Sequence, residues 1–180
     1  MVRKYEALLC GSVEADSGEI NMPLMRDYTN PPYMRVSTDD LQRALIDLEK
    51  QADLPSHIAK KILENPKDSV TQYDVVGREE LSGNPVTRVT LTSVSGRTHQ
   101  LNVHCAAFGH PIAGDKVYGL NGEASPNGGL DDIDNANKAT SAVQEAVNAA
   151  SDSMCIHAKH LSFTHPVTGE SLNFESASPF

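Results

Sequence analysis

The sequence predicts an α+β domain, in which a mixed but mostly antiparallel sheet carries peripheral helices. Two observations support this class. Short runs that alternate apolar with polar residues, bounded by glycine and proline, recur in three blocks of the chain and are typical of strands. Two segments between these blocks, 39–68 and 121–153, instead repeat apolar residues at the helical period. A chain of 180 residues has the size of one domain, or of a part of one.

The first strand is expected over Lys4–Cys10, where Tyr5, Ala7 and Leu9 share one face. A glycine ends it, and an extended, proline-containing segment continues to Val36. One side of this strand should therefore pack against the core.

The segment 39–68 is expected to form a helical pair. Ser37 and Asp40 give a start that resembles a capping box, and leucines and an alanine follow at i, i+3, i+4 and i+7. Pro55 interrupts this pattern, Ser56 can restart it, and an Asn-Pro pair ends it.

The second strand block covers Gln72–Gly77 and Val86–Val94, after which a Ser-Gly pair turns the chain. A helix should follow, with Thr98 as its N-cap and Gly109 just past its end. Its apolar stripe consists of Leu101, His104, Cys105 and Phe108.

The segment 121–153 begins as a loop rich in Gly, Asn and Asp, and then predicts a short helix with Ser141 and Gln144 at its cap. The last block predicts a hairpin of His160–Phe163 with Ser171–Phe174, because the HPVTG sequence between them suits a tight turn.

Charge is unevenly distributed along the chain. The total is −9, of which 39–68 carries −2 and 121–153 carries −5, so the strand-rich remainder carries −2. The whole chain argues against a nonspecific nucleic-acid binder, but a nearly neutral body can still hold a basic groove. Both helical segments are interpreted as solvated surface insertions.

Several classes of protein are disfavoured by simple patterns. No apolar run reaches the roughly 18 residues of a membrane span, so no membrane partner is expected. Three cysteines far apart, without a CxxC pair, disfavour a disulfide framework and favour a reducing, intracellular compartment. His99, His104 and His110 lie five and six residues apart, a spacing that does not share one helix face, so no metal is expected.

The predicted turn between the second strand block and the following helix carries Arg97. A guanidinium at such a turn can bind a carboxylate or a phosphate, and His99 and Gln100 follow where backbone N–H groups attract anions. An ordinary surface ion pair is the alternative for Arg97. His104, on the apolar stripe, is interpreted as a hydrogen-bonded core residue.

The segment GRTHQLNVHCAAFGHPIAGDKVYG, from Gly96 to Gly119, resembles the signature of RluA-type pseudouridine synthases, and the resemblance extends to other segments in the family's order. These are the Lys4–Ala7 strand (K-x-Y-x-A), residues 18–27 (G-x-I-x-x-P-L, continued to Asp27), Thr71–Val75 (T-x-Y-x-V) and His157–Phe174 (HA-x-x-L-x-F-x-HP-x-TGE).

The resemblance implies an enzyme that isomerises uridine to pseudouridine in rRNA or tRNA, without metal or cofactor. It implies that Arg97 pairs with a nucleophilic aspartate and that Tyr5 lies against the uracil. RNA contacts are expected from the side chains at the start of the first strand, in the proline-containing segment and around the turn. These are Lys4, Arg26, Thr98, His99 and Gln100. The compartment, cytoplasmic or organellar, is left open.

Three departures from the family pattern affect the expected site. The aspartate belongs to an R-L-D-x-x-T-S-G-like segment, which does not occur in these residues. Asn102 replaces an arginine and Pro32 a frequently basic residue, which we interpret as a loss of charge that could contact phosphate.

Residues 1–180 are therefore expected to form a single partial catalytic domain, truncated at its N-terminus and inactive alone. Segments 39–68 and 121–153 are its expected insertions. Two other interpretations stay open: a non-catalytic RNA-binding pseudoenzyme, and a structural module whose acidic segments bind a protein.

Overall fold

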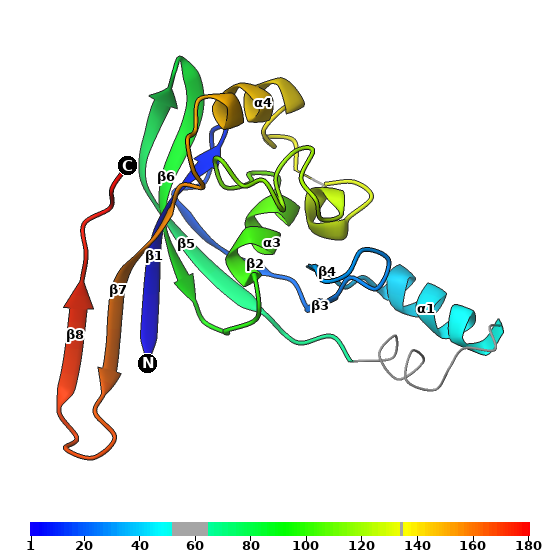
Figure 1. Ribbon diagram of the computed structural model, residues 1–180, viewed down its shortest axis with the longest axis horizontal. Helices are drawn as coiled ribbons and strands as arrows, with labels where there is room; N and C mark the ends of the chain where they lie inside the picture. The colour runs from blue at the N-terminus through cyan, green and yellow to red at the C-terminus, as the bar shows by residue number, and fades with distance from the viewer. Residues whose placement is uncertain (52–64, 134) are drawn as a thin grey trace.

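The computed structural model describes residues 1–51, 65–133 and 135–180, and its centre is a twisted six-stranded sheet (Figure 1). The strand order is β2-β5-β6-β1-β7-β8, and each neighbouring pair is antiparallel. The predicted α+β class with a mostly antiparallel sheet is confirmed. The strands are β1 (Val2–Cys10), β2 (Ser17–Asn21), β5 (Val70–Leu81), β6 (Asn84–Ser93), β7 (Ile156–Thr164) and β8 (Ser171–Glu175).

Strand β1 lies in the middle of this sheet, between β6 and β7. Its alternating side chains separate two faces, as predicted: Ala7 and Leu9 are buried in one core cluster with Val89 and Leu91 of β6. Helix α3 (Gln100–Ala107) packs on this face, which we call the front face.

The β5–β6 hairpin is longer than the sequence indicated, because β5 does not end at Gly77. The strand continues to Leu81, with a register shift between Val75 and Gly77. The turn consists of Ser82 and Gly83, which have φ of 51° and 77°. Two successive positive φ values suit the twist of a tight hairpin.

A small second sheet pairs β3 (Leu24–Arg26) with β4 (Met34–Val36), and α1 (Asp39–Gln51) extends from it away from the main sheet (Figure 1). Helix α1 confirms the first of the two predicted helices; the second falls at 52–64, outside the described residues. The N-cap was predicted wrongly, since the Leu41 N–H donates to Thr38 Oγ1 at 3.2 Å.

Helix α3 ends as predicted, with Gly109 at φ 92°, but begins differently. Its N-cap is His99, in a left-handed conformation with φ 52°, and no side chain caps the helix. The prediction of Thr98 as N-cap is therefore wrong.

The segment 121–153 is not the solvated surface elaboration that its charge suggested. It contains a short 3-10 turn, η1 (Pro126–Gly129), and α4 (Ser141–Ala149), and its alanines and aliphatic residues enter the core. The buried ones include Ala124, Ile133, Ala139 and Val147. The cap of α4 is Thr140, whose hydroxyl accepts from the Val143 N–H, one residue before the predicted start.

The terminal hairpin of β7 and β8 forms where it was predicted. Leu161 lies opposite Phe174 and Phe163 opposite Leu172. The Phe163 and Phe174 rings stack, with centroids 6.1 Å apart.

Candidate nucleic-acid interface

The turn between β6 and α3 is fixed by Gln100, which is buried. Its Oε1 accepts from the Arg97 N–H at 3.0 Å and from the Ser95 hydroxyl at 2.9 Å. Its Nε2 donates to Val70 O at 2.9 Å and to Thr71 Oγ1 at 3.0 Å. Four hydrogen bonds satisfy a side-chain amide completely, so these contacts give Gln100 a positioning role in the turn. We call this arrangement the Gln100 clamp.

The Arg97 side chain is exposed beside this turn. Its Nε and Nη2 lie 3.4 Å from the carbonyl oxygen of Asp68, which does not neutralise a guanidinium. No ion pair joins Arg97 to another described residue, so the surface ion pair that was the alternative interpretation is not found within the described chain.

Arg97 lines a cavity of about 340 Å³ together with two other cations, Arg26 and Lys67. Arg26 belongs to β3, and Lys67 lies beside it because the backbones of Lys67 and Leu24 exchange hydrogen bonds of 2.8 and 2.9 Å. Thr98 and Pro32 also line this space, and among the described residues no acidic side chain does. We call it the basic cavity; its charge suits a phosphate group.

Lys67 is a candidate that sequence reasoning missed. Lys67 lies four residues before Thr71, which begins the T-x-Y-x-V segment. This position next to a family segment is the feature of the sequence that could have identified it. Arg3 is a second one: a side-chain carbon at Gly96 would clash with Arg3 Nη2, so this guanidinium lies against the Arg97 turn.

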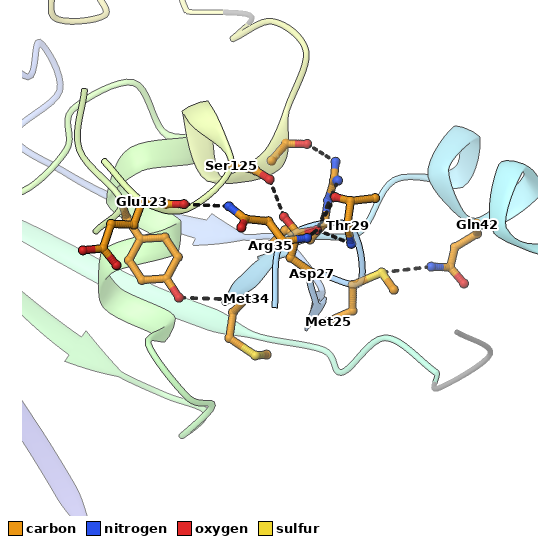
Figure 2. Close-up of polar contacts among 11 residues, drawn as sticks. Met25, Asp27, Thr29, Met34, Arg35, Gln42, Glu123 and Ser125 are labelled. Carbon is orange, nitrogen blue, oxygen red and sulfur yellow. Dashed lines mark hydrogen bonds and ion pairs between the residues drawn. The ribbon is translucent and has the colours of Figure 1, made fainter. Parts of the chain in front are cut away.

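The other wall of the basic cavity is held by Asp27, a buried carboxylate just after β3 (Figure 2). Oδ1 accepts from Thr29 N at 3.1 Å, Thr29 Oγ1 at 2.6 Å and Asn30 N at 3.2 Å, and Oδ2 accepts from the Ser125 hydroxyl. Arg35 Nη1 lies 3.9 Å from Oδ1. We call these contacts the Asp27 clamp.

The Asp27 clamp keeps its carboxylate ionised. Burial alone would raise the pKa of Asp27, but the hydrogen bonds from Ser125 and Thr29, together with Arg35, outweigh it and lower the pKa. Asn30 Nδ2 also donates to Glu123 O at 2.6 Å, and Arg35 Nη2 to Gly129 O (Figure 2). The segment that begins at 121 therefore supports the wall of the cavity.

The two departures from the family pattern have different surroundings. Asn102 Nδ2 donates to the buried Asp115 Oδ2 at 2.9 Å, and Asp115 Oδ1 accepts from the backbone N–H groups of Val117 and Tyr118. Asn102 thus lies beside an internal carboxylate and outside the lining of the basic cavity, and its interpretation as a lost phosphate contact stays a prediction. Pro32, in contrast, lines the basic cavity.

The other predicted site residues Tyr5, Lys4 and His99 are not part of the lining of the basic cavity. Tyr5 is half-buried on the front face and packs against the core, outside the lining of the basic cavity. Lys4 lines a different cavity with Lys159 and Glu175, because adjacent residues of a strand point to opposite faces. His99 Nδ1 lies 2.7 Å from the Tyr118 hydroxyl, which also accepts from the Met34 N–H.

The other two histidines of the signature segment are internal. His104 is fully buried between Thr71 Oγ1 and Met22 O, at 2.9 and 3.0 Å, which confirms it as a hydrogen-bonded core residue. Burial lowers the pKa of both His104 and His110. Within the described ranges, no group of three or more His, Cys, Asp or Glu side chains could hold a metal ion.

Comparison with known sequences gives relatives along nearly the whole chain. The dual-specificity RNA pseudouridine synthase RluA of Pasteurella multocida is 32% identical over 178 residues, which cover 99% of this chain and 58% of the relative. The RluA of Haemophilus influenzae is 31% identical with the same coverage. The chain thus spans little more than half the length of these curated relatives. No family model matches it.

Comparison with solved structures also finds pseudouridylate synthase domains, here by similarity of the fold. Human RNA Pseudouridylate Synthase Domain Containing 1 superposes with a TM-score of 0.65 at 25% identity, over 99% of this chain and 55% of that one. Human RNA Pseudouridylate Synthase Domain Containing 4 shares the fold, with a TM-score of 0.55 at 21% identity. This match covers 99% of this chain and 58% of that one.

The fold is that of a pseudouridine synthase domain. Within this class, the chain belongs to the RluA-type RNA pseudouridine synthase family, as its signature segment indicated. No helix in the described part of the chain is long and apolar enough to cross a membrane.

Proposed function

We propose that this chain supplies the RNA-binding wall and part of the active site of an RNA pseudouridine synthase, which isomerises uridine in rRNA or tRNA. The observation that carries the proposal is the basic cavity, which Arg97, Arg26 and Lys67 all line. Such a cluster of cations favours phosphate binding, although the chain as a whole is acidic.

In this proposal, the target uridine is flipped out of its helix toward the Arg97 turn. The Gln100 clamp holds the backbone of Arg97, so that the guanidinium is aimed without further reorganisation. Arg97 would pair with the nucleophilic aspartate of an R-L-D-x-x-T-S-G-like segment, lower its pKa and orient it.

Tyr5 would lie against the uracil ring, while Arg26 and Lys67 hold the phosphates beside it. The glycosidic bond moves from N1 to C5 of the same base and a proton moves from C5 to N1. The reaction is therefore balanced without an added cofactor or metal.

RNA binding by the chain itself is the first test. A uridine-containing stem-loop RNA should bind in a fluorescence anisotropy titration, with affinity falling steeply between about 50 and 200 mM salt. Lys67→Ala and Arg26→Ala should each weaken binding and reduce the salt slope by about 1. The control is Arg43→Ala, an exposed arginine on α1 that pairs with Asp40, and it should bind like the original chain. An equal loss in Arg43→Ala would refute a localised site.

The catalytic role of Arg97 needs a protein that contains the aspartate segment. In such a protein, Arg97→Ala should reduce pseudouridine formation at least about 100-fold, because the loss of a charged partner in a desolvated site is costly. Arg97→Lys should restore part of the RNA affinity but little of the turnover, since an ammonium cannot make a bidentate contact. Turnover by Arg97→Ala at the original rate would sink this role.

The pseudoenzyme remains the second candidate, because the R-L-D-x-x-T-S-G-like segment does not occur in residues 1–180. It predicts the same RNA binding without turnover. Sequencing the native transcript upstream of the Met1 codon separates the two candidates: an in-frame aspartate segment supports the enzyme, and its absence supports the pseudoenzyme.

A further inference from the structure

A second cavity, of about 510 Å³, lies on the front face at the C-terminal end of α3, away from the residues that line the basic cavity. Its walls are mainly apolar and include Met22, Tyr73, Phe108 and Ile133. The Tyr73 and Phe108 rings lie with centroids 5.3 Å apart and form an aromatic floor. This volume is within the range of sites that hold small organic molecules. We call it the His110 cavity.

His110 also lines this cavity, although only 1% of its surface is exposed. Its Nδ1 lies 2.9 Å from the Cys10 carbonyl oxygen. A carbonyl only accepts, so Nδ1 carries the proton, and Nε2 of the neutral ring is then an acceptor. Burial lowers the pKa of His110 and thus favours the neutral ring.

Nε2 of His110 has no hydrogen-bond partner among the described residues. It is also not among the fully enclosed unpaired atoms of the described chain, which are Arg35 Nε and His157 Nε2. Since His110 lines the cavity, we infer that this nitrogen is the part of the ring that a ligand there would meet. A buried acceptor without a partner favours a ligand that brings an N–H or O–H donor.

The rim of the cavity carries one carboxylate that no described ion pair neutralises. Glu14 and Asp132 are both exposed carboxylates in the lining. Asp132 forms an ion pair with Lys138 at 3.1 Å, whereas Glu14 accepts a hydrogen bond from the neutral side chain of Asn137. An aromatic floor, an acceptor in the wall and the Glu14 carboxylate at the rim are complementary to a ligand with a flat ring, a hydrogen-bond donor and a positive charge.

We propose that the His110 cavity binds a small aromatic amine. The flat ring packs on Phe108 and Tyr73, a ring N–H donates to His110 Nε2, and a protonated amino group lies at the Glu14 carboxylate. This site is distinct from the basic cavity and does not depend on RNA binding.

Tryptamine is the probe, since it has an indole N–H and an ammonium group on one small body. Binding is measured by titration calorimetry at low salt, and by amide NMR shifts around Phe108 and Ile133. Saturable binding is expected. 1-Methyltryptamine, which lacks the ring N–H, should bind about tenfold more weakly because Nε2 stays unpaired. Indole-3-propionate, which reverses the charge, should not bind.

Two variants locate the site. Ala15→Trp places a large side chain at an exposed position in the cavity lining and should abolish binding. Ala142→Trp, at an exposed position of α4 outside this lining, is the matched control and should bind like the original chain. The variant Glu14→Gln should weaken binding about three- to fivefold at low salt.

Absence of tryptamine binding would overturn the proposal, as would equal binding by Ala15→Trp or by 1-methyltryptamine. Arg97→Ala should leave tryptamine binding unchanged. The two sites can therefore fail or succeed separately.

Discussion

The two walls of the basic cavity are held by two buried polar side chains of different chemistry. The Gln100 clamp is a neutral amide that bonds within the turn and to the neighbouring β5, up to 30 residues away. The Asp27 clamp is an ionised carboxylate that joins β3 to Ser125, 98 residues away. The first wall is therefore mostly local and insensitive to pH, whereas the second requires both a distant segment and a charge.

This difference explains why the acidic segment that begins at 121 is not a surface decoration. The hydroxyl of Ser125 and the carbonyls of Glu123 and Gly129 all bond to residues between 27 and 35 (Figure 2). Helix α1 makes no comparable contribution, because Leu45 is the single buried side chain among its described residues. The segment that begins at 121 thus supports the site through hydrogen bonds, whereas α1 extends away from the main sheet.

The largest effect is expected from the Asp27 clamp. Asp27→Ala removes a buried carboxylate and leaves several donors and Arg35 unpaired, so it should lower the free energy of unfolding by about 3–5 kcal/mol. Urea unfolding followed by circular dichroism measures it. Asp39→Ala, at an exposed position of α1, is the control and should stay within about 0.5 kcal/mol. A loss below about 1 kcal/mol for Asp27→Ala would mean that the clamp is not a structural centre.

The Gln100 clamp should give a smaller loss of stability. Gln100→Ala leaves the Arg97 N–H without its partner, whereas the Val70 carbonyl still accepts from the Val94 N–H at 3.2 Å. The change should cost about 1–3 kcal/mol. It should also weaken RNA binding, since the Arg97 turn loses its fixed geometry. Gln144→Ala is the control: its amide donates to the Ala139 carbonyl at the start of α4, outside the lining of the basic cavity. If Gln100→Ala and Gln144→Ala bound RNA equally well, the clamp would have no role in the site.

The smallest expected effect is a difference between the Asp27 clamp and the Gln100 clamp in how their contribution to stability depends on pH. The pKa of Asp27 is lower in the folded chain than its unfolded value of about 3.9, so its contribution is fully present above that value. It is lost as pH falls through the folded pKa. The stability advantage of the original chain over Asp27→Asn should therefore be constant from neutral pH to about 5 and shrink below about 4.

The advantage of the original chain over Gln100→Ala should stay constant across the same range, because no titrating group is changed. Glu6 and Glu79, whose pKa values are also lowered by ion pairs, are common to all these variants and cancel in the differences. A constant difference for Asp27→Asn down to pH 3 would contradict a lowered pKa of Asp27 in the folded chain.

Much of the fold could be read from local patterns. The alternation at Tyr5, Ala7 and Leu9 predicted the front face of β1, and the HPVTG turn sequence predicted the hairpin of β7 and β8. Gly109 marked the end of α3 because a left-handed residue there favours glycine. The signature segment around Arg97 also indicated the family and the strand-to-helix turn of the candidate site.

Other features could not be read in this way. The N-cap of α3 is His99 rather than Thr98, since Gln100 fixes the turn from inside the core. Asn102 lies against Asp115 rather than in the basic cavity, and Lys67 reaches that cavity only because its backbone pairs with Leu24. Each depends on a partner outside the local pattern.

The sequence by itself determined most strands of the main sheet, the presence of α1, α3 and α4, and the family, because these follow from periodicity, turn chemistry and a contiguous motif. The tertiary structure alone decided which charges share a cavity, which acidic segment enters the core, and that the buried His110 lines a second cavity. The physical reason is range: backbone periodicity acts over a few residues, whereas burial and hydrogen-bond partners depend on contacts such as Asp27 with Ser125, 98 residues apart.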